Sequence, residues 1–207
     1  MVREFSGLLL FSAVVLGISA CGGTKPEIPV NRESVRPGSS VARGTEQFKL
    51  LGNPLSEGNP LPSVPLVDAM TMQEADLSKE RGSVLLLSLV PSIDTRVCEA
   101  QTHSLGEGGN ILPKEVRRIT ISRDTPFAQK RFATEAKLTH LQYLSDYKQG
   151  DFGRSTGLLV DGSMLLARSV ILVDKKGIVR YIQVVPDLAN LPDMERAFQK
   201  ATELVKD

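Results

Sequence analysis

The chain has 207 residues, of which 41% are hydrophobic and 24% are charged. These values suit one globular domain with a sizeable core and an additional tail. The net charge of +1 comes from dispersed Lys and Arg residues and gives no indication of a surface that binds nucleic acid.

The first residues have the pattern of a secretory signal. Arg3 supplies a short charged region, residues 8–16 form an apolar run too short to span a bilayer, and Ile-Ser-Ala precedes Cys21. The pattern resembles the signals of bacterial lipoproteins, which are cleaved before a cysteine that then becomes acylated. The resemblance implies a signal peptide at residues 1–20 and a lipid anchor on Cys21. It places the protein in the bacterial cell envelope, at the periplasmic face or the outer membrane. An ordinary signal peptide is the alternative.

The segment after Cys21 lacks the periodicity of a helix or a strand. Residues 21–46 contain Gly, Pro, Ser, Asn and Arg without a large apolar cluster, which predicts a flexible tether. A folded domain is then expected over residues 47–207. Phe48–Pro65 is dense in Pro and Gly and suits a short hairpin ahead of the main sheet.

The centre of the domain is predicted between residues 84 and 101. Val84–Val90 reads as a strand buried on both faces, and Pro91 cannot continue a central strand. Asp94 or Thr95 is suited to cap a helix that starts there, which places Cys98 in its first turn. Because the helix dipole and free N–H groups stabilise negative charge in that turn, Cys98 is a candidate thiolate nucleophile.

The remaining elements alternate between strands and helices. Gly106, Gly108 and Gly109 predict that the helix after Cys98 is short or frayed, so its segment is expected to unfold locally at low cost. The expected later elements are a strand over residues 116–122, a helix from Pro126, a strand at 142–145, an antiparallel hairpin of strands 169–173 and 178–184, and an amphipathic helix over 194–205. This order predicts an α/β fold with a mixed sheet flanked by helices.

The string Pro91-x-x-x-Thr95-x-x-Cys98 resembles the active-site pattern of the peroxiredoxins, in particular their thiol peroxidase subfamily. The resemblance extends to residues 124–132, 145–153 and 166–174. It implies a thioredoxin-like fold with an N-terminal hairpin and a thiol-dependent peroxidase without metal or prosthetic group. Peroxide is the implied substrate. The family often forms homodimers, so a homodimer is a candidate assembly.

The same resemblance assigns roles to particular side chains. Cys98 becomes the nucleophile, Thr95 hydrogen-bonds the sulfur or the peroxide, Pro91 shields the site from water, Arg168 reaches into the pocket and Phe127 walls it. Without the resemblance each has an ordinary interpretation: a small buried hydrophobe, a helix cap, a strand stop, a surface arginine and a core aromatic residue. Four further residues near these positions are expected to be solvated or in loops: Arg96, Glu99, His103 and His140.

Recycling of the nucleophile is where the sequence departs from the family. The thiol peroxidases that it resembles have a second, resolving cysteine just after Lys-Arg-Phe, where this chain has Ala133. If Cys21 is acylated, Cys98 is the only thiol left, and its sulfenic acid cannot form a disulfide within the chain. We therefore expect reduction by an external thiol, which is a thioredoxin-like protein, a small thiol of the glutathione type or a partner subunit.

Two other functions compete with the peroxidase. One is a catalytically faded relative that acts as a redox sensor or a binding lipoprotein, which Ala133 and the glycine-interrupted helix suggest. A thiol–disulfide oxidoreductase ranks below both, because the chain has no Cys-x-x-Cys motif.

Overall fold

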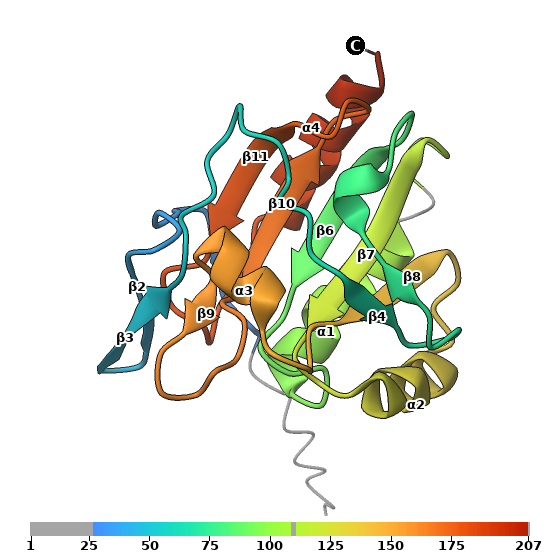
Figure 1. Ribbon diagram of the computed structural model, residues 1–207. Coiled ribbons are helices and arrows are strands. Elements are labelled where there is room, and N and C mark those ends of the chain that lie inside the picture. The colour runs from blue at the N-terminus through green and yellow to red at the C-terminus, as the bar shows by residue number, and fades with distance from the viewer. Residues whose placement is uncertain (1–26, 109–110, 207) are drawn as a thin grey trace, which may run out of the picture.

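The computed structural model describes residues 27–108 and 111–206, which build a mixed β-sheet covered on both faces (Figure 1). Strands β6, β7 and β8 are parallel, and the outer strands join by antiparallel pairing. In spatial order the strands are β11 (Val179–Val184), β10 (Ser169–Val173), β6 (Val84–Leu89), β7 (Val116–Ser122), β8 (Leu141–Ser145), β4 (Leu66–Asp68) and β5 (Glu74–Ala75). The predicted α/β class with a mixed central sheet is confirmed.

Strand β6 lies in the middle of the sheet because every one of its side chains is apolar or small and buried. Its residues alternate between two hydrophobic clusters on opposite faces, as the pleat of a strand requires. Leu85 and Leu87 join one cluster, and Val84 and Leu86 join the other. A strand buried on both faces explains the continuous apolar run in the sequence.

The two faces of the sheet are covered by different elements (Figure 1). One face packs against α1 (Arg96–Glu107), α2 (Pro126–Ala136) and α4 (Met194–Lys206), whose buried residues contact the sheet. The other face packs against α3 (Asp151–Thr156) and a small sheet of β2 (Ser40–Arg43), β3 (Glu46–Leu51) and β9 (Leu159–Val160). A 3₁₀ turn (Leu77–Lys79) leads towards β6.

The prediction of a flexible tether over residues 21–46 is wrong for residues 27–46, which belong to the fold. Strand β1 (Val30–Asn31) pairs in parallel with β12 (Leu191–Pro192). The amide of Gln183 donates to the carbonyl oxygens of Asn31 and Glu33, at 2.8 and 3.2 Å. Backbone pairing with β12 and hydrogen bonds from the Gln183 side chain hold this segment, and such bonds leave no periodic pattern in a sequence. We call residues 27–43 the N-terminal strap.

The predicted N-terminal hairpin exists, but it lies earlier in the chain. Strands β2 and β3 are antiparallel, with Ser40 opposite Lys49 and Arg43 opposite Glu46. Gly44 at the turn has φ 62°, a left-handed conformation that glycine adopts without strain. The Pro- and Gly-rich residues after Leu51 form loops rather than the hairpin.

Helix α1 is longer than its glycines predicted. It continues through Gly106 to Glu107, and Gly108 caps its end. A Cβ atom on Gly106 would lie 2.9 Å from Leu138 Cδ2, and one on Gly108 would clash with the ring of Phe198. Both glycines therefore serve close packing of the helix end. The prediction of a short or frayed helix is therefore correct only about where the helix ends, since α1 ends at Glu107 and Gly108 is its C-cap.

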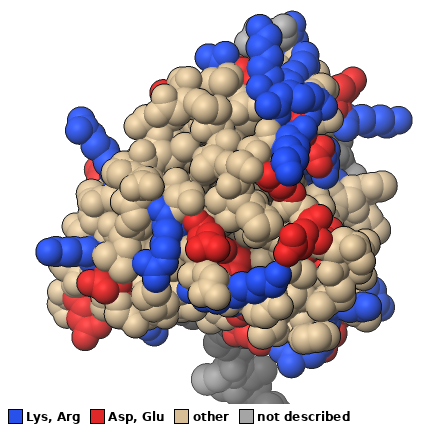
Figure 2. Space-filling view, viewed as in Figure 1, with Lys and Arg blue, Asp and Glu red and all other residues tan. Residues whose placement is uncertain are grey.

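The surface carries charges of both signs. Figure 2 shows Asp and Glu side chains next to Lys and Arg side chains across the middle of the face it presents. Ion pairs among the described residues include Arg180–Asp174 at 2.7 Å and Lys148–Glu74 at 2.9 Å. None of the helices in the described part of the chain has the length and apolarity that a bilayer crossing requires. Residues 1–26, with the predicted signal and Cys21, lie outside the described residues.

Candidate active site

The loop between β6 and α1 is fixed by a carboxylate from the neighbouring strand. Asp124 follows the end of β7, and its oxygens accept from the Ser92 hydroxyl at 2.8 Å and the Ile93 backbone N–H at 2.6 Å. The Ser122 hydroxyl donates to the same carboxylate at 2.6 Å. Since β6 and β7 are parallel, their carboxyl ends meet at one edge, where open α/β sheets bind ligands.

Cys98 lies in the first turn of α1, as predicted, and its side chain is fully buried. Its carbonyl oxygen accepts from the Thr102 hydroxyl at 2.8 Å, one turn further along. The unpaired N–H groups and the dipole of the helix favour negative charge at this position. The helix therefore presents the sulfur in an environment suited to a thiolate.

The guanidinium of Arg168 joins the sulfur to its surroundings. Its Nη2 lies 3.4 Å from Cys98 Sγ, Nη1 donates to Gln101 Oε1 at 2.8 Å, and Nε donates to the Leu188 carbonyl oxygen at 3.0 Å. Arg168 is only 2% exposed. Three separate acceptors thus hold one buried planar cation in a single orientation, beside the sulfur.

Gln101 is a site residue that the sequence analysis did not single out. Its side chain is fully buried, and its amide nitrogen donates to Ser88 Oγ at 2.8 Å and to the Leu89 carbonyl oxygen at 3.3 Å. The amide thereby bridges β6 and Arg168. Its position three residues after Cys98 puts both on one face of the helix, and this spacing was the available signal.

Pro91 and Thr95 lie at the site, and the Thr95 hydroxyl does not bond the sulfur, whereas its predicted bond to a peroxide stays a prediction. Both line the cavity described below. The Thr95 hydroxyl donates to the Ser92 carbonyl oxygen at 3.2 Å, not to the sulfur, and caps no N–H of α1. Thr95 is the N-cap residue by its extended backbone alone, so its hydroxyl stiffens the loop.

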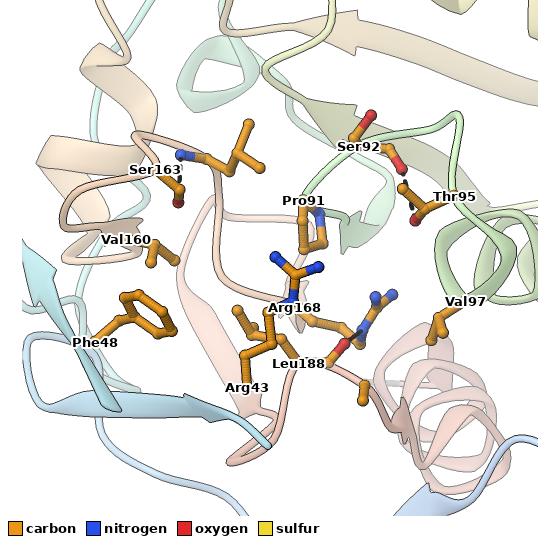
Figure 3. Close-up of a pocket in the computed structure, with 12 residues that line it drawn as sticks. Arg43, Phe48, Pro91, Ser92, Thr95, Val97, Val160, Ser163, Arg168 and Leu188 are labelled. Carbon is orange, nitrogen blue, oxygen red and sulfur yellow. Dashed lines mark hydrogen bonds between the residues drawn. The ribbon is translucent and has the colours of Figure 1, made fainter. Parts of the chain in front are cut away.

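A cavity of about 300 Å³ opens in front of Arg168. Figure 3 shows the side chains of Arg43 and Arg168 at this cavity. Arg43 is the last residue of β2, and Arg168 directly precedes β10. Cys98 is not among the residues that line this cavity, but its sulfur lies 3.4 Å from Nη2 of Arg168, which does line it. The lining residues are Arg43, Phe48, Pro91, Ser92, Thr95, Val97, Val160, Ser163, Leu165, Arg168, Leu188 and Ala189.

The prediction that Phe127 walls the pocket is wrong, and so is its alternative of core packing. Phe127 is 72% exposed in the first turn of α2. The buried residues of that helix are Pro126, Gln129 and Phe132, which face the sheet, and Phe127 is rotated away from them. The aromatic wall of the cavity is Phe48 of β3.

The charged neighbours of the nucleophile lie outside the cavity. Glu99 is exposed on α1, and His103 Nδ1 lies 3.2 Å from Glu107 Oε1 on the same helix. His140 lies in the loop before β8 with φ 59°. Within residues 27–108 and 111–206, no three or more His, Cys, Asp or Glu side chains group as metal ligands would.

Ala133 of α2 packs against a small hydrophobic cluster that contains Cys98 and Tyr143. The Tyr143 hydroxyl is buried without a hydrogen-bond partner in the described structure. Burial raises the pKa of Tyr143 to about 12. Ala133 therefore lies in the same apolar packing unit as Cys98.

Known proteins are similar to this chain over most of its length. The chain is 38% identical over 164 residues to the thiol peroxidase of Halalkalibacterium halodurans, a match covering 79% of this chain and 97% of that protein. The Redoxin family model matches residues 56–198. The chain belongs to the thiol peroxidases of the redoxin family. The thiol peroxidase of Bacillus subtilis is 35% identical, with 76% of this chain and 93% of that protein covered.

Solved structures agree with this membership. A peroxiredoxin-like protein from Aquifex aeolicus superposes with a TM-score of 0.73 at 30% identity, over 80% of this chain and 96% of that one. The thiol peroxidase from Chromobacterium violaceum, at 22% identity, shares the fold with a TM-score of 0.71 over 80% of this chain and 98% of that one. The predicted peroxiredoxin, thioredoxin-like fold is confirmed. In this thiol peroxidase, Arg43 and Phe48 precede the part that the family model matches.

Proposed function

We propose that this enzyme reduces hydrogen peroxide or organic hydroperoxides by a one-cysteine mechanism, with an external thiol as reductant. The observation that carries the proposal is the 3.4 Å contact between Arg168 Nη2 and Cys98 Sγ at the start of α1. A fixed cation and a helix start converge on one sulfur, which favours the nucleophilic thiolate. The intact network around Arg168 favours an active peroxidase over a faded sensor.

In the first step the Cys98 thiolate attacks the terminal oxygen of the hydroperoxide. The S–O bond forms as the O–O bond breaks, so sulfur is oxidised to a sulfenic acid. The departing alkoxide, or hydroxide from hydrogen peroxide, takes a proton from solvent and leaves as alcohol or water. The Arg168 guanidinium stabilises the charge that develops on the oxygens, because its donors are already oriented in a site shielded from water.

In the second step an external thiol attacks the sulfenic sulfur, releasing water and forming a mixed disulfide. A second thiol then releases Cys98 as a thiol and leaves as a disulfide. Cys98 is the only cysteine in the described residues and is fully buried. The first turn of α1 therefore has to open before a bulky reductant reaches the sulfur.

The proposal is tested by peroxide consumption with thioredoxin or glutathione as donor, in the wild type and in Cys98→Ser. We expect turnover in the wild type and none in Cys98→Ser. Non-reducing gels after one equivalent of peroxide should show a monomer of unchanged mobility or an intermolecular adduct. Cys21→Ser is the matched control, and it should behave like the wild type. An internally cross-linked monomer, absent from Cys21→Ser, would show instead that Cys21 resolves the sulfenic acid.

We also propose that Cys21 carries the lipid anchor. The support is the apolar run of residues 8–16 followed by Ile-Ser-Ala-Cys. Eight residues, 22–29, separate Cys21 from the start of β1 at Val30. Fully extended, they span roughly 28 Å, so an acylated Cys21 would hold the folded domain close to the membrane. Acyl chains at about 0.8 kcal/mol per buried CH₂ are sufficient for stable anchorage when two or more are present.

Mass spectrometry of the mature N-terminus and detergent-phase partitioning test this anchor. The expected mature protein begins at acylated Cys21 and enters the detergent phase, whereas Cys21→Ser stays in the aqueous phase. A mature N-terminus elsewhere, or a Cys21 without added mass, would contradict the anchor.

A homodimer is a further part of the proposal, by resemblance to the family. Phe127 on α2 is the position at which to probe a dimer contact, because its ring is 72% exposed. Sedimentation equilibrium should give twice the monomer mass, and Phe127→Ser should shift the equilibrium towards monomer. A monomer at micromolar concentration in the wild type would refute the dimer.

A further inference from the structure

The cavity in front of Arg168 has walls of two different chemical kinds. Most of its surface is apolar and comes from residues including Phe48, Val97, Val160, Leu165 and Leu188. Its charged side chains are Arg43 and Arg168, and no Asp or Glu stands among the described residues that line it. An apolar chamber with cations and no carboxylate suits a ligand that combines an apolar body with a negative charge.

The two arginines are in different situations. Arg168 is buried and already donates to Leu188, Gln101 and Cys98. Arg43 is exposed, and none of the hydrogen bonds or ion pairs found among the described residues engages its guanidinium. Arg43 therefore keeps its donors available for a ligand at the mouth, while Arg168 serves the reacting atoms.

Backbone bonds fix the position of Arg43 relative to Arg168. Ala42, beside it in β2, donates its N–H to the Pro186 carbonyl oxygen at 2.6 Å and accepts from the Leu188 N–H at 2.9 Å. Leu188 is also the residue whose carbonyl oxygen accepts from Arg168 Nε. One short loop thus joins the N-terminal strap to the catalytic arginine and sets the spacing between the two cations.

We propose that Arg43 is a specificity-determining residue that binds the carboxylate of a single-chain hydroperoxy acid. This inference rests on the proposed peroxidase function. The Arg43 guanidinium presents paired N–H donors that match a carboxylate, and the apolar wall covers the carbon chain. The hydroperoxide end then lies at Arg168, whose guanidinium contacts the Cys98 sulfur. The volume of about 300 Å³ is at the lower end for ligand sites, which favours a free acid over a bulky diacyl lipid.

The test compares hydroperoxyoctanoic acid with its methyl ester as substrates of the full-length enzyme. The ester keeps the carbon chain and the hydroperoxide but replaces the anionic carboxylate that Arg43 would bind by a neutral methyl ester. We expect the wild type to have a kcat/KM roughly fivefold higher for the acid, the ratio that a solvent-accessible ion pair supports. The ratio should fall to about one in Arg43→Gln and should shrink with added salt in the wild type.

Lys49→Gln is the matched control, because Lys49 carries the same charge on β3 of the same hairpin and does not line the cavity. This variant should keep the wild-type preference for the acid. A wild type without that preference would overturn the inference, as would an unchanged ratio in Arg43→Gln or an equal loss in Lys49→Gln. Failure of the specificity inference and failure of the peroxidase function are distinguishable. A wild type that consumes neither hydrogen peroxide nor either organic hydroperoxide contradicts the peroxidase function itself.

Discussion

Gln101 Oε1 accepts a hydrogen bond from Arg168 Nη1 at 2.8 Å, three residues along α1 from the sulfur that the same guanidinium contacts. Helix α1 thus carries the nucleophile and also the group that orients its cationic partner. The other end of the Gln101 amide is anchored to Ser88 and Leu89 of β6. The geometry of the active site is therefore set by the central strand as well as by the helix.

Replacing Gln101 by Leu should slow the oxidation of Cys98 about 10- to 100-fold, because Arg168 loses its orienting acceptor. The effect should appear in the second-order rate constant with hydrogen peroxide, measured in stopped flow. Gln101→Glu should recover much of the loss, since a carboxylate oxygen also accepts from Arg168. Equal defects in the two variants would mean that Gln101 contributes packing and not orientation.

Val41→Ala in the N-terminal strap should lower the free energy of unfolding by about 2 kcal/mol, since Val41 is 1% exposed in the larger core cluster. Denaturant titration measures the change. Val30→Ala is the control on the same strap, because Val30 is 53% exposed and its loss should be nearly neutral. Unaltered stability in Val41→Ala would indicate that the strap is not an integral part of the fold.

Tyr143→Phe should raise the free energy of unfolding by about 1 kcal/mol at neutral pH, because it removes a buried hydroxyl that has no partner in the described structure. The pH dependence gives a second readout. The folded-state pKa of about 12 exceeds the unfolded value near 10, so the folded state keeps the proton longer. The wild type should lose stability as pH rises from about 10 to 12, and Tyr143→Phe should lose less. An equal loss of stability at alkaline pH in the two proteins would contradict the assignment of this pH dependence to Tyr143.

Ala133→Cys should let the Cys98 sulfenic acid form a disulfide within the chain, in place of a mixed disulfide with an external thiol. Position 133 packs against the cluster that contains Cys98, so a cysteine there is placed to attack the sulfenic acid once the first turn of α1 opens. One equivalent of peroxide should then give a faster-migrating, internally cross-linked monomer on a non-reducing gel. Thr134→Cys is the control, because Thr134 lies one position along α2 and its hydroxyl donates to the Lys130 carbonyl oxygen. The same cross-link in both variants would show that proximity at position 133 is not the cause.

The parts of the fold that sequence patterns predicted are those with local signals. The apolar run of β6, the stop at Pro91, the hairpin of β10 and β11 and the amphipathic α4 all carry a periodicity or a turn residue. Cys98 and Arg168 were found by motif, and the structure brings them into contact.

The parts that were missed depend on contacts between distant residues. The two-residue strands β1 and β12 are too short for any periodicity, and the strap is held by hydrogen bonds to Gln183, some 150 residues away. Asp124 and Arg43 reach the site through the sheet topology, which no local pattern encodes. The prediction for Phe127 was wrong because a sequence motif does not show which face of the helix a residue occupies. The buried face of α2 carries Pro126, Gln129 and Phe132 instead.

The most direct test of the central claim is the rate of a single turnover at Cys98 in the wild type and in Arg168→Lys. An ammonium cannot make the three directed contacts of the guanidinium, so its oxidation by peroxide should be about 100- to 1000-fold slower. Wild-type Cys98 should react orders of magnitude faster than free cysteine. A wild-type rate no better than that of free cysteine, or an Arg168→Lys rate equal to the wild type, would contradict the account.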